Sequence, residues 1–581
     1  MGSARKTAPE TGQGTPAREG QAAGAAPPGQ GTPPQAGQAA AAAETRPGIA
    51  GRAAVLVRNP WTMAGLVGLL AAVVLWLVVQ PLAGASNDTD AAASVLYFER
   101  LVHGQRLEAF VPTTPKPLLT VVYGVAWALT GDWRTLTILS VAVGAAAVAL
   151  AARLAARLAG NAAAAAAAIV IVGLLAWPDF GLEVAQANSF VWGLALWLLA
   201  GVLVTADRPR PWLAGAVFVL AGLTRTETIW LLGAAFGCAA WIWLRALRGG
   251  DRVQLRTVLP LLLGALAIPL ACLHDLLLTG RPLYWLGVPA GYTAVAYPGL
   301  ASVSPVESIR KELVHYEPAL ALLALALLGG AWLIHSRRRA VALALASLAG
   351  GVLLTLVVLA WRAVFISARY YEEADAAVLL AAAIGTAALI VWTFDRLARS
   401  RVDADRWRSL ATAVVATALV LGVVAVDVPH GTVESEVAPT GQAYAALQTR
   451  INDLTPILTG AQGGTAELAG ANYPVADPAT CRLFVPRSLL PIVSLETGAP
   501  ITALGDSYLA FRDGKYALKP GQWVLHISAA DGSGGVYAPF EHSAPTTLTA
   551  VSGQRVAVVP VITDPDRGLW LDRIDAAPAG S

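Results

Sequence analysis

Charged residues are scarce in this sequence, at 14% of its 581 residues, whereas a soluble globular domain has about 25%. Cysteine is also rare: Cys238, Cys272 and Cys481 lie far apart without a CxxC motif, so neither a zinc site nor a disulfide framework is indicated. The 41 basic and 38 acidic residues almost balance, so the sequence lacks the excess of positive charge that is typical of nucleic-acid-binding proteins. Hydrophobic residues, by contrast, make up 56%, and the mean hydropathy is +0.58. The composition predicts an integral membrane protein.

Residues 1–52 lack the apolar side chains that a folded core needs. They contain no aromatic residue, and no leucine, isoleucine or valine precedes Ile49. Such a segment does not bury enough apolar surface to offset the entropy lost on ordering. Its layout is also unlike that of a signal peptide. We therefore predict a disordered cytoplasmic tail.

From residue 53 onwards the chain contains apolar runs that can cross a bilayer, which takes about 20 residues of helix. The runs lie near 61–82, 135–157, 160–178, 189–206, 211–224, 228–246, 257–275, 318–335, 340–361, 373–393 and 409–427. The short fifth and sixth runs are interpreted as a hairpin. The predicted fold of residues 53–428 is an α-helical polytopic membrane domain with about eleven transmembrane helices.

The positions of the arginines orient these spans. In a layout of eleven spans, every large basic cluster falls on the same side of the membrane as the N-terminus. The clusters are Arg52 and Arg58; Arg153 and Arg157; Arg208 and Arg210; Arg245, Arg248, Arg252 and Arg256; Arg337, Arg338 and Arg339; and Arg396, Arg399, Arg401, Arg406 and Arg408. The positive-inside rule then predicts a cytoplasmic N-terminus and an extracytoplasmic C-terminus.

Four regions are predicted on the outer side: a long first loop at 83–134, a shorter loop at 178–188, a loop at 276–317, and a C-terminal region at 429–581. The C-terminal region contains the alternating runs GQWVLHIS (521–528) and QRVAVVPVI (554–562), bounded by turn residues. A period of two residues is typical of half-buried strands. We predict an extracytoplasmic β-rich domain there.

Ionisable residues are missing from the centres of the predicted spans and gather at their outer ends. Charges inside the bilayer usually mark ion or substrate pathways, so their scarcity disfavours an ion-coupled transporter. Any chemistry is therefore expected at the outer membrane–water interface. A transporter of envelope lipids and a non-catalytic envelope scaffold that binds glycan through its C-terminal domain stay open as alternatives.

Asp88 and Asp90 form the densest acidic candidate, just after the first span. The segment that follows, 91–108, has apolar residues between 95 and 102 that recur at helical spacing, and it predicts an amphipathic helix in the interface. The two acids either cap this helix or provide a general base, because desolvation raises a carboxyl pKa towards the working range.

Four basic or acidic residues at the outer face are candidates for holding a phosphate. Lys116 lies between two prolines in TPKPLL (114–119), and Arg225 and Glu227 lie in LTRTE (223–227). Arg369 precedes Tyr370 at the start of the tenth span. A cation at the membrane interface can bind a phosphate. Each motif also has a purely structural explanation: Lys116 can snorkel to the interface, Arg225 and Glu227 can pair with each other, and Tyr370 can belong to an interfacial aromatic belt.

Together these motifs resemble the C-type superfamily of glycosyltransferases that use lipid-linked sugars, such as protein O-mannosyltransferases and aminoarabinose transferases. The resemblance covers about residues 55–430 and depends on the order of four short motifs. These are Asp90 with Gly104 fourteen residues later, Lys116-Pro117, Thr224-Arg225-Thr226-Glu227, and Arg369-Tyr370.

The sequence departs from that superfamily at two points. Thr226 replaces the usual proline, and the outer start of the fourth span has Asn188 where relatives often carry an acid, with Glu183 five residues earlier. We regard Glu183, Asn188 and Tyr370 as candidates for acceptor binding or orientation.

The resemblance implies a hexosyl- or pentosyltransferase that moves a sugar from a polyprenyl phosphate to an extracytoplasmic acceptor, with inversion. Asp90, and second Asp88, would be the base, with Lys116, Arg225 and Arg369 on the phosphate and Glu227 orienting Arg225. Asp88 and Asp90 are also the only ligands suggested for a divalent cation, Mg²⁺ or Mn²⁺, which stays undecided. The implied location is a bacterial plasma membrane, with a cell-wall glycan, a lipid or a protein as acceptor.

Overall fold

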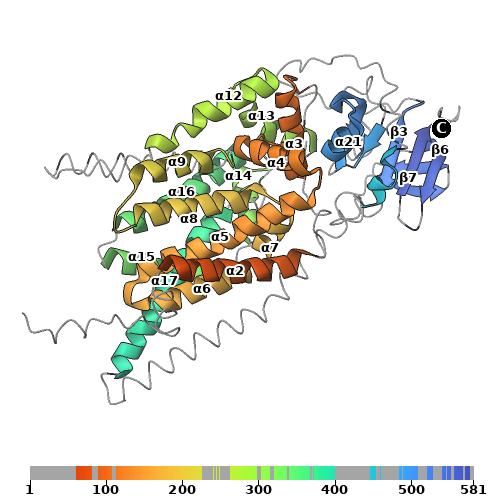
Figure 1. The fold of residues 1–581 in the computed structure, drawn as a ribbon. Coiled ribbons are helices and arrows are strands. Elements are labelled where there is room, and N and C mark those ends of the chain that lie inside the picture. Colours follow the sequence, from red (N-terminus) through yellow and green to blue (C-terminus); the bar gives the residue numbers. More distant parts are fainter. Residues whose placement is uncertain are drawn as a thin grey trace, which may run out of the picture. The chain divides into compact units, whose positions relative to one another are not determined.

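Figure 1 shows the computed structural model of the chain. The structure describes residues 60–80, 89–107, 111, 113–225, 240, 244, 248, 262–296, 303–314, 319–335, 339–364, 366, 370, 372–398, 445–452, 454, 458, 483–486, 489–507, 520–527, 540–544, 546–550, 555–564, 566 and 569–575. The predicted tail at 1–52 and the predicted span at 409–427 lie outside these residues. So does almost all of the predicted span at 228–246.

The described residues between 60 and 398 form mainly helices (Figure 1). They are α2 (Pro60–Val79), α3 (Thr89–Val102), α4 (Pro117–Thr130), α5 (Arg134–Ala159), α6 (Ala163–Leu175), α7 (Pro178–Ala185), α8 (Ser189–Val204), α9 (Pro211–Gly222), α12 (Ala267–Thr279), α13 (Tyr284–Ala296), α14 (Pro305–Val314), α15 (Ala319–His335), α16 (Arg339–Trp361) and α17 (Glu372–Ala398). Most of the predicted apolar runs in the described chain thus contain a helix.

Fewer helices meet the length of a full span than the sequence predicted. Among the described residues, four are long and apolar enough to cross a membrane, and a fifth results if the bent pair α7–α8 is one span. The four are Trp61–Val79, Arg134–Leu175, Leu262–Thr279 and Glu372–Phe394. The shorter apolar helices are Pro117–Thr130, Pro211–Gly222, Leu323–His335 and Ala349–Trp361. The count of about eleven spans is therefore not confirmed.

Arg134–Leu175 is interrupted where the sequence predicted a boundary between two spans. A single 3₁₀ turn, η2 (Gly160–Ala162), joins α5 to α6, and Gly160 has a φ of 61°. Glycine adopts a positive φ without the steric cost that a Cβ atom imposes. The chain changes direction there, and α5 and α6 pack against each other.

Two glycines bring α15 and α17 into close contact. A Cβ atom on Gly329 would lie 1.9 Å from the carbonyl oxygen of Ala381, and one on Gly385 would lie 2.2 Å from that of Leu325. Small residues let membrane helices approach at backbone distance. The contact holds α17 in place, and the first turn of α17 carries acidic residues of the site.

The amphipathic helix predicted after Asp88 and Asp90 is present as α3, but α3 does not lie on the surface along its whole length. Val102 is 62% exposed, whereas every residue from Ala91 to Tyr97 is 1% exposed or less. Both α4 and α21 (Leu490–Thr497) pack against α3. The apolar periodicity identified the helix, but it did not show that the alanines on its other faces are covered too.

The C-terminal part forms a seven-stranded sheet with the strand order β2-β1-β3-β7-β6-β5-β4. The strands are β1 (Leu483–Val485), β2 (Leu504–Asp506), β3 (Trp523–Ile527), β4 (Phe540–Ala544), β5 (Thr547–Ala550), β6 (Arg555–Asp564) and β7 (Leu569–Ile574). β1 is parallel to β2 and β3, and the remaining pairs are antiparallel. The strands predicted within 521–528 and 554–562 are confirmed as β3 and β6.

Candidate functional site

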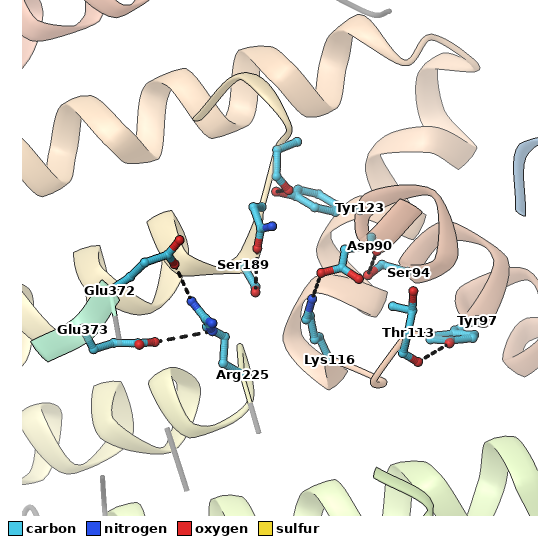
Figure 2. A network of polar contacts seen from close by, with 12 residues as sticks. Asp90, Ser94, Tyr97, Thr113, Lys116, Tyr123, Ser189, Arg225, Glu372 and Glu373 are labelled. Carbon is cyan, nitrogen blue, oxygen red and sulfur yellow. Dashed lines mark hydrogen bonds and ion pairs between the residues drawn. The ribbon is translucent and has the colours of Figure 1, made fainter. Parts of the chain in front are cut away.

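Asp90 and Lys116 form an ion pair at the start of two neighbouring helices. The Nζ atom of Lys116 donates to Oδ2 of Asp90 over 2.5 Å, as Figure 2 shows. Asp90 lies in the first turn of α3, and Lys116 directly precedes α4. The lysine side chain is 8% exposed and that of the aspartate 21%. The structure thus joins the predicted base and one predicted phosphate ligand in a single contact.

The local sequence around Lys116 explains its position. Pro117 occupies the first position of α4, where a missing N–H costs nothing, and it holds Lys116 in an extended conformation. The N-terminus of a helix carries a partial positive charge. Lys116 adds a full charge at the same place, so this corner of the molecule favours an anion, and the carboxylate of Asp90 is that anion here.

A second contact ties α3 to the segment that leads into Lys116. The hydroxyl of Tyr97 donates to the backbone carbonyl of Thr113 over 2.7 Å. Burial, with the nearby Tyr284 and Asp90, raises the pKa of Tyr97 well above its usual value. The hydroxyl is therefore a permanent donor at neutral pH, and the bond holds the loop against the helix.

Helix α3 also approaches α4 closely at Gly124. A Cβ atom there would lie 2.0 Å from Cγ and 2.2 Å from Cβ of Phe98. A residue with a side chain at position 124 would therefore push α3 away. The glycine permits the spacing at which Asp90 reaches Lys116.

A backbone hydrogen bond joins Lys116-Pro117 to the Thr224-Arg225 motif. The amide of Leu118 donates to the carbonyl of Leu223 over 3.0 Å. Thr224 and Arg225 follow directly at the end of α9 and are 0% and 4% exposed. Two motifs that lie about a hundred residues apart in the sequence are thus neighbours in the fold.

Arg225 is held by two carboxylates at the start of α17. Its Nη1 atom donates to Oε2 of Glu372 over 2.9 Å, and its Nε atom lies 3.4 Å from Oε1 of Glu373 (Figure 2). Both glutamates are 5% exposed or less. Glu227, which was predicted to orient Arg225, lies outside the described residues.

Sequence reasoning missed Glu372 and Glu373. A usable signal existed, because two consecutive acids stand at the outer end of an apolar run, directly after Tyr370 and Tyr371. Acids at such a position are costly to bury unless a cation pairs with them. The sequence did not identify that cation as Arg225.

The break between α7 and α8 carries the predicted acceptor residues Glu183 and Asn188. The two helices bend by 110° there, and Ala187 has a φ of 52°. The amide of Asn188 donates to the carbonyl of Glu183 over 2.9 Å, and its Oδ1 atom accepts from Oγ of Ser189 over 3.0 Å. Both side chains are 2% exposed.

Tyr123 connects this break to α4. Its hydroxyl donates to the carbonyl of Ala187 over 2.7 Å and accepts from Nε1 of Trp192 over 2.9 Å. Helix α4, which follows Lys116, is thereby fixed to the α7–α8 break. The break is positioned relative to the Asp90–Lys116 pair by side chains of α4.

The further predicted site residues are Tyr370, Asp88 and Arg369. Tyr370 is half-buried and packs in an apolar cluster with Val352, Ala360 and Ile366. Asp88 and Arg369 lie outside the described residues. Their predicted roles stay predictions.

One polar group near α3 was not foreseen. Asp275, at the end of α12, is 1% exposed, and its Oδ2 atom accepts from the amide of Trp285 over 2.7 Å. Nδ1 of His274 lies 3.4 Å from Oδ1 of the same carboxylate. The bond to Trp285 connects α12 to the start of α13, which is a structural role.

The sequence suggested Asp88 and Asp90 as ligands of a divalent cation. Within the described part of the chain, no group of three or more His, Cys, Asp or Glu side chains could hold a metal ion. Asp90 instead pairs with Lys116, while Asp88 is outside that part. A divalent cation thus stays a prediction.

Comparison with known proteins gives structural likeness only. No protein-family model matches the chain, and no curated protein matches it. Among solved structures, the chain is similar to the Archaeoglobus fulgidus oligosaccharyltransferase tethered with an acceptor peptide, with 13% identity over 88% of this chain and 75% of that chain (TM-score 0.47). The same oligosaccharyltransferase in complex with Zn and sulfate matches with 13% identity over 84% and 72% (TM-score 0.47).

A third similar structure is ArnT from Cupriavidus metallidurans in the apo state, with 12% identity over 90% of this chain and 98% of that chain (TM-score 0.41).

Proposed function

We propose that this protein is a membrane glycosyltransferase that transfers a sugar from a polyprenyl-phosphate-linked donor to an extracytoplasmic acceptor with inversion. The observation that carries the proposal is the Asp90–Lys116 ion pair at the start of α3 and α4. It combines a partly exposed carboxylate with a buried cation next to a helix N-terminus, which suits a base beside a phosphate.

In the proposed reaction, an acceptor hydroxyl attacks the anomeric carbon on the face opposite the phosphate. A new carbon–oxygen bond forms to the acceptor, and the bond to the phosphate oxygen breaks. The bonding electron pair leaves with the polyprenyl phosphate, and the hydroxyl proton passes to Asp90. A positioned base of this kind contributes about 10²–10⁴-fold to a rate.

Lys116 would have two successive partners. Without donor, its ammonium pairs with Asp90. The phosphate of the donor is also an anion and would compete for the same ammonium, which would free the carboxylate of Asp90 to face the acceptor. Donor binding would therefore precede acceptor activation.

Arg225 would contribute a guanidinium to the same site from a fixed position. Glu372 and Glu373 use part of its guanidinium, which presents five N–H donors in a rigid fork. We propose that its role is to orient and stabilise the phosphate end of the donor. Asp88, Glu227 and Arg369 would complete the site, while Glu183, Asn188 and Tyr370 would handle the acceptor.

A complementation experiment tests the proposal. A deletion strain would receive the wild-type gene, Asp90→Asn or Asp132→Asn, at matched membrane levels, and its envelope glycans would be compared by mass. Asp132 is an exposed acid of the same loop whose carboxylate accepts from the amide of Arg134, so it is a matched control.

We expect the deletion to lose a sugar that wild type and Asp132→Asn restore and that Asp90→Asn does not. The missing mass then identifies the sugar class and the acceptor. If Asp90→Asn restored the lost sugar fully, Asp90 would not be the general base, and the scaffold and transporter alternatives would be favoured.

A further inference from the structure

The helix that carries Asp90 has two packing partners, one from each end of the chain. Helix α4 packs against α3, and so does α21 from the C-terminal part. The apolar residues of α3 between Ala91 and Tyr97, which exclude Ser94, belong to one buried apolar cluster with Leu490, Ile492 and Val493 of α21. The C-terminal part is therefore continuous with the core around the site.

A polar contact reinforces this packing. Nε1 of Trp133 donates to Oε1 of Glu496 on α21 over 3.2 Å, and the Trp133 ring lies against that of Trp127 on α4, with 4.2 Å between centroids. Trp133 is 4% exposed. The bond links α21 to the turn between α4 and α5.

Helix α3 depends on such partners for its own stability. It has 14 residues, and a helix of this length is marginal in water without tertiary packing. Its first turns are mostly alanine, with small side chains that bury little area per residue. Cover from both α4 and α21 explains why these turns are buried.

We infer that α21 positions the catalytic helix, so that Val493 and Glu496 keep Asp90 at the Lys116 ammonium although neither residue touches substrate. The inference rests on the proposed function for the role of Asp90. It gives the C-terminal part a task in the reaction itself, through the α21–α3 contact.

Two valine-to-alanine variants test the inference. Val493→Ala removes two methyl groups from the α21 side of the shared cluster. Val524→Ala makes the same change on β3, and both valines are 0% exposed. Since Leu525 and Ile527 belong to the shared cluster and alternate residues of a strand face opposite sides, Val524 lies on the other face of the sheet.

Two readouts separate positioning from general loss of stability. Amide hydrogen exchange in the peptide covering 91–102 reports the opening of α3. Steady-state kinetics with the polyprenyl-phosphate donor separate kcat from KM. For Val493→Ala we expect exchange about tenfold faster, and kcat about tenfold lower with donor KM within about twofold. We expect Val524→Ala to leave both unchanged.

Glu496 offers a conservative rescue. Glu496→Ala removes the acceptor for the Trp133 indole, whereas Glu496→Gln keeps a carbonyl oxygen in the same place. We expect Glu496→Ala to behave like a weaker Val493→Ala, with about threefold effects, and Glu496→Gln to behave like wild type.

Equal exchange in α3 for Val493→Ala and Val524→Ala would overturn the inference, and so would faster exchange with unchanged kcat. Failure of the proposed function looks different. Wild-type protein would then transfer no sugar, while the exchange difference between the two valine variants would still show the α21–α3 contact.

Discussion

The two ion-paired groups of the site differ in exposure and in stoichiometry. Within the part of the chain that the structure describes, Lys116 pairs with one carboxylate, that of Asp90, whose side chain is 21% exposed. Arg225 faces two carboxylates, and all three of these side chains are 6% exposed or less. A partly exposed pair can exchange its anion with a ligand, whereas a fully buried triad is costly to break. We conclude that the first group suits chemistry and the second suits positioning.

The largest expected effect tests the buried triad. Arg225→Met would leave Glu372 and Glu373 buried without their cation, and we expect a loss of about 3–5 kcal/mol in the free energy of unfolding. Unfolding of the purified protein in detergent measures it. Adding Glu372→Gln and Glu373→Gln to Arg225→Met should recover most of the loss, because no buried charge is then left unpaired. A stable single variant would contradict the comparison.

The second largest effect is expected at the partly exposed Asp90–Lys116 pair, where the donor phosphate would replace Asp90 as the partner of the ammonium. Lys116→Gln removes the ammonium that the donor phosphate would use. A hydrogen bond to a charged group is worth about 1.5–3 kcal/mol, so we expect the donor KM to rise about 10–100-fold. The free energy of unfolding should change by only about 1 kcal/mol, because water reaches Asp90.

Lys116→Arg is the control for that experiment, since it keeps the positive charge and its donors. We expect it to recover part of the donor affinity. If Lys116→Gln and wild type have the same donor KM, the ammonium does not meet the phosphate, and Lys116 only holds Asp90.

A smaller effect tests the spacing of α3 on α4. Gly124→Ala would place a methyl group against Phe98, and overpacking of this kind costs about 1–3 kcal/mol. Transfer activity should fall as well, because α3 carries Asp90. Gly65→Ala on α2 is a matched control with nothing within 4 Å of its Cβ, and it should be neutral or slightly stabilising. A Gly124→Ala variant that is as stable as Gly65→Ala would contradict the close approach of α3 to α4.

The sequence predicted those parts of the structure that depend on local pattern. Apolar runs located most of the described helices, and alternation located β3 and β6, because both follow from the burial of neighbouring residues. Pairings between distant residues were harder. Lys116 and Asp90 lie 26 residues apart and were proposed for different roles, while Arg225 and Glu372 lie 147 residues apart. One sequence contains no signal for such a contact.

The burial of α3 is a second feature that the local sequence pattern predicted only in part. Its apolar periodicity predicted one buried face, as for a helix at an interface. The alanines at 91–93 gave no sign of burial, because alanine is common on exposed and covered helix faces alike. Their cover comes from α4 and from α21, and α21 lies almost 400 residues further along the chain.

The smallest expected effect concerns the hydrogen bond that ties α3 to the loop before Lys116. Tyr97→Phe removes the donor to the carbonyl of Thr113 and leaves that oxygen without it, which should cost about 1 kcal/mol in the free energy of unfolding. Burial raises the pKa of the Tyr97 hydroxyl well above its usual value of about 10. Folding therefore disfavours the ionised form, and below about pH 9 the hydroxyl is protonated in both the folded and unfolded states. The stability difference between Tyr97→Phe and wild type should thus be constant from about pH 6 to 9, and a difference that vanishes within this range would show that the bond is not made.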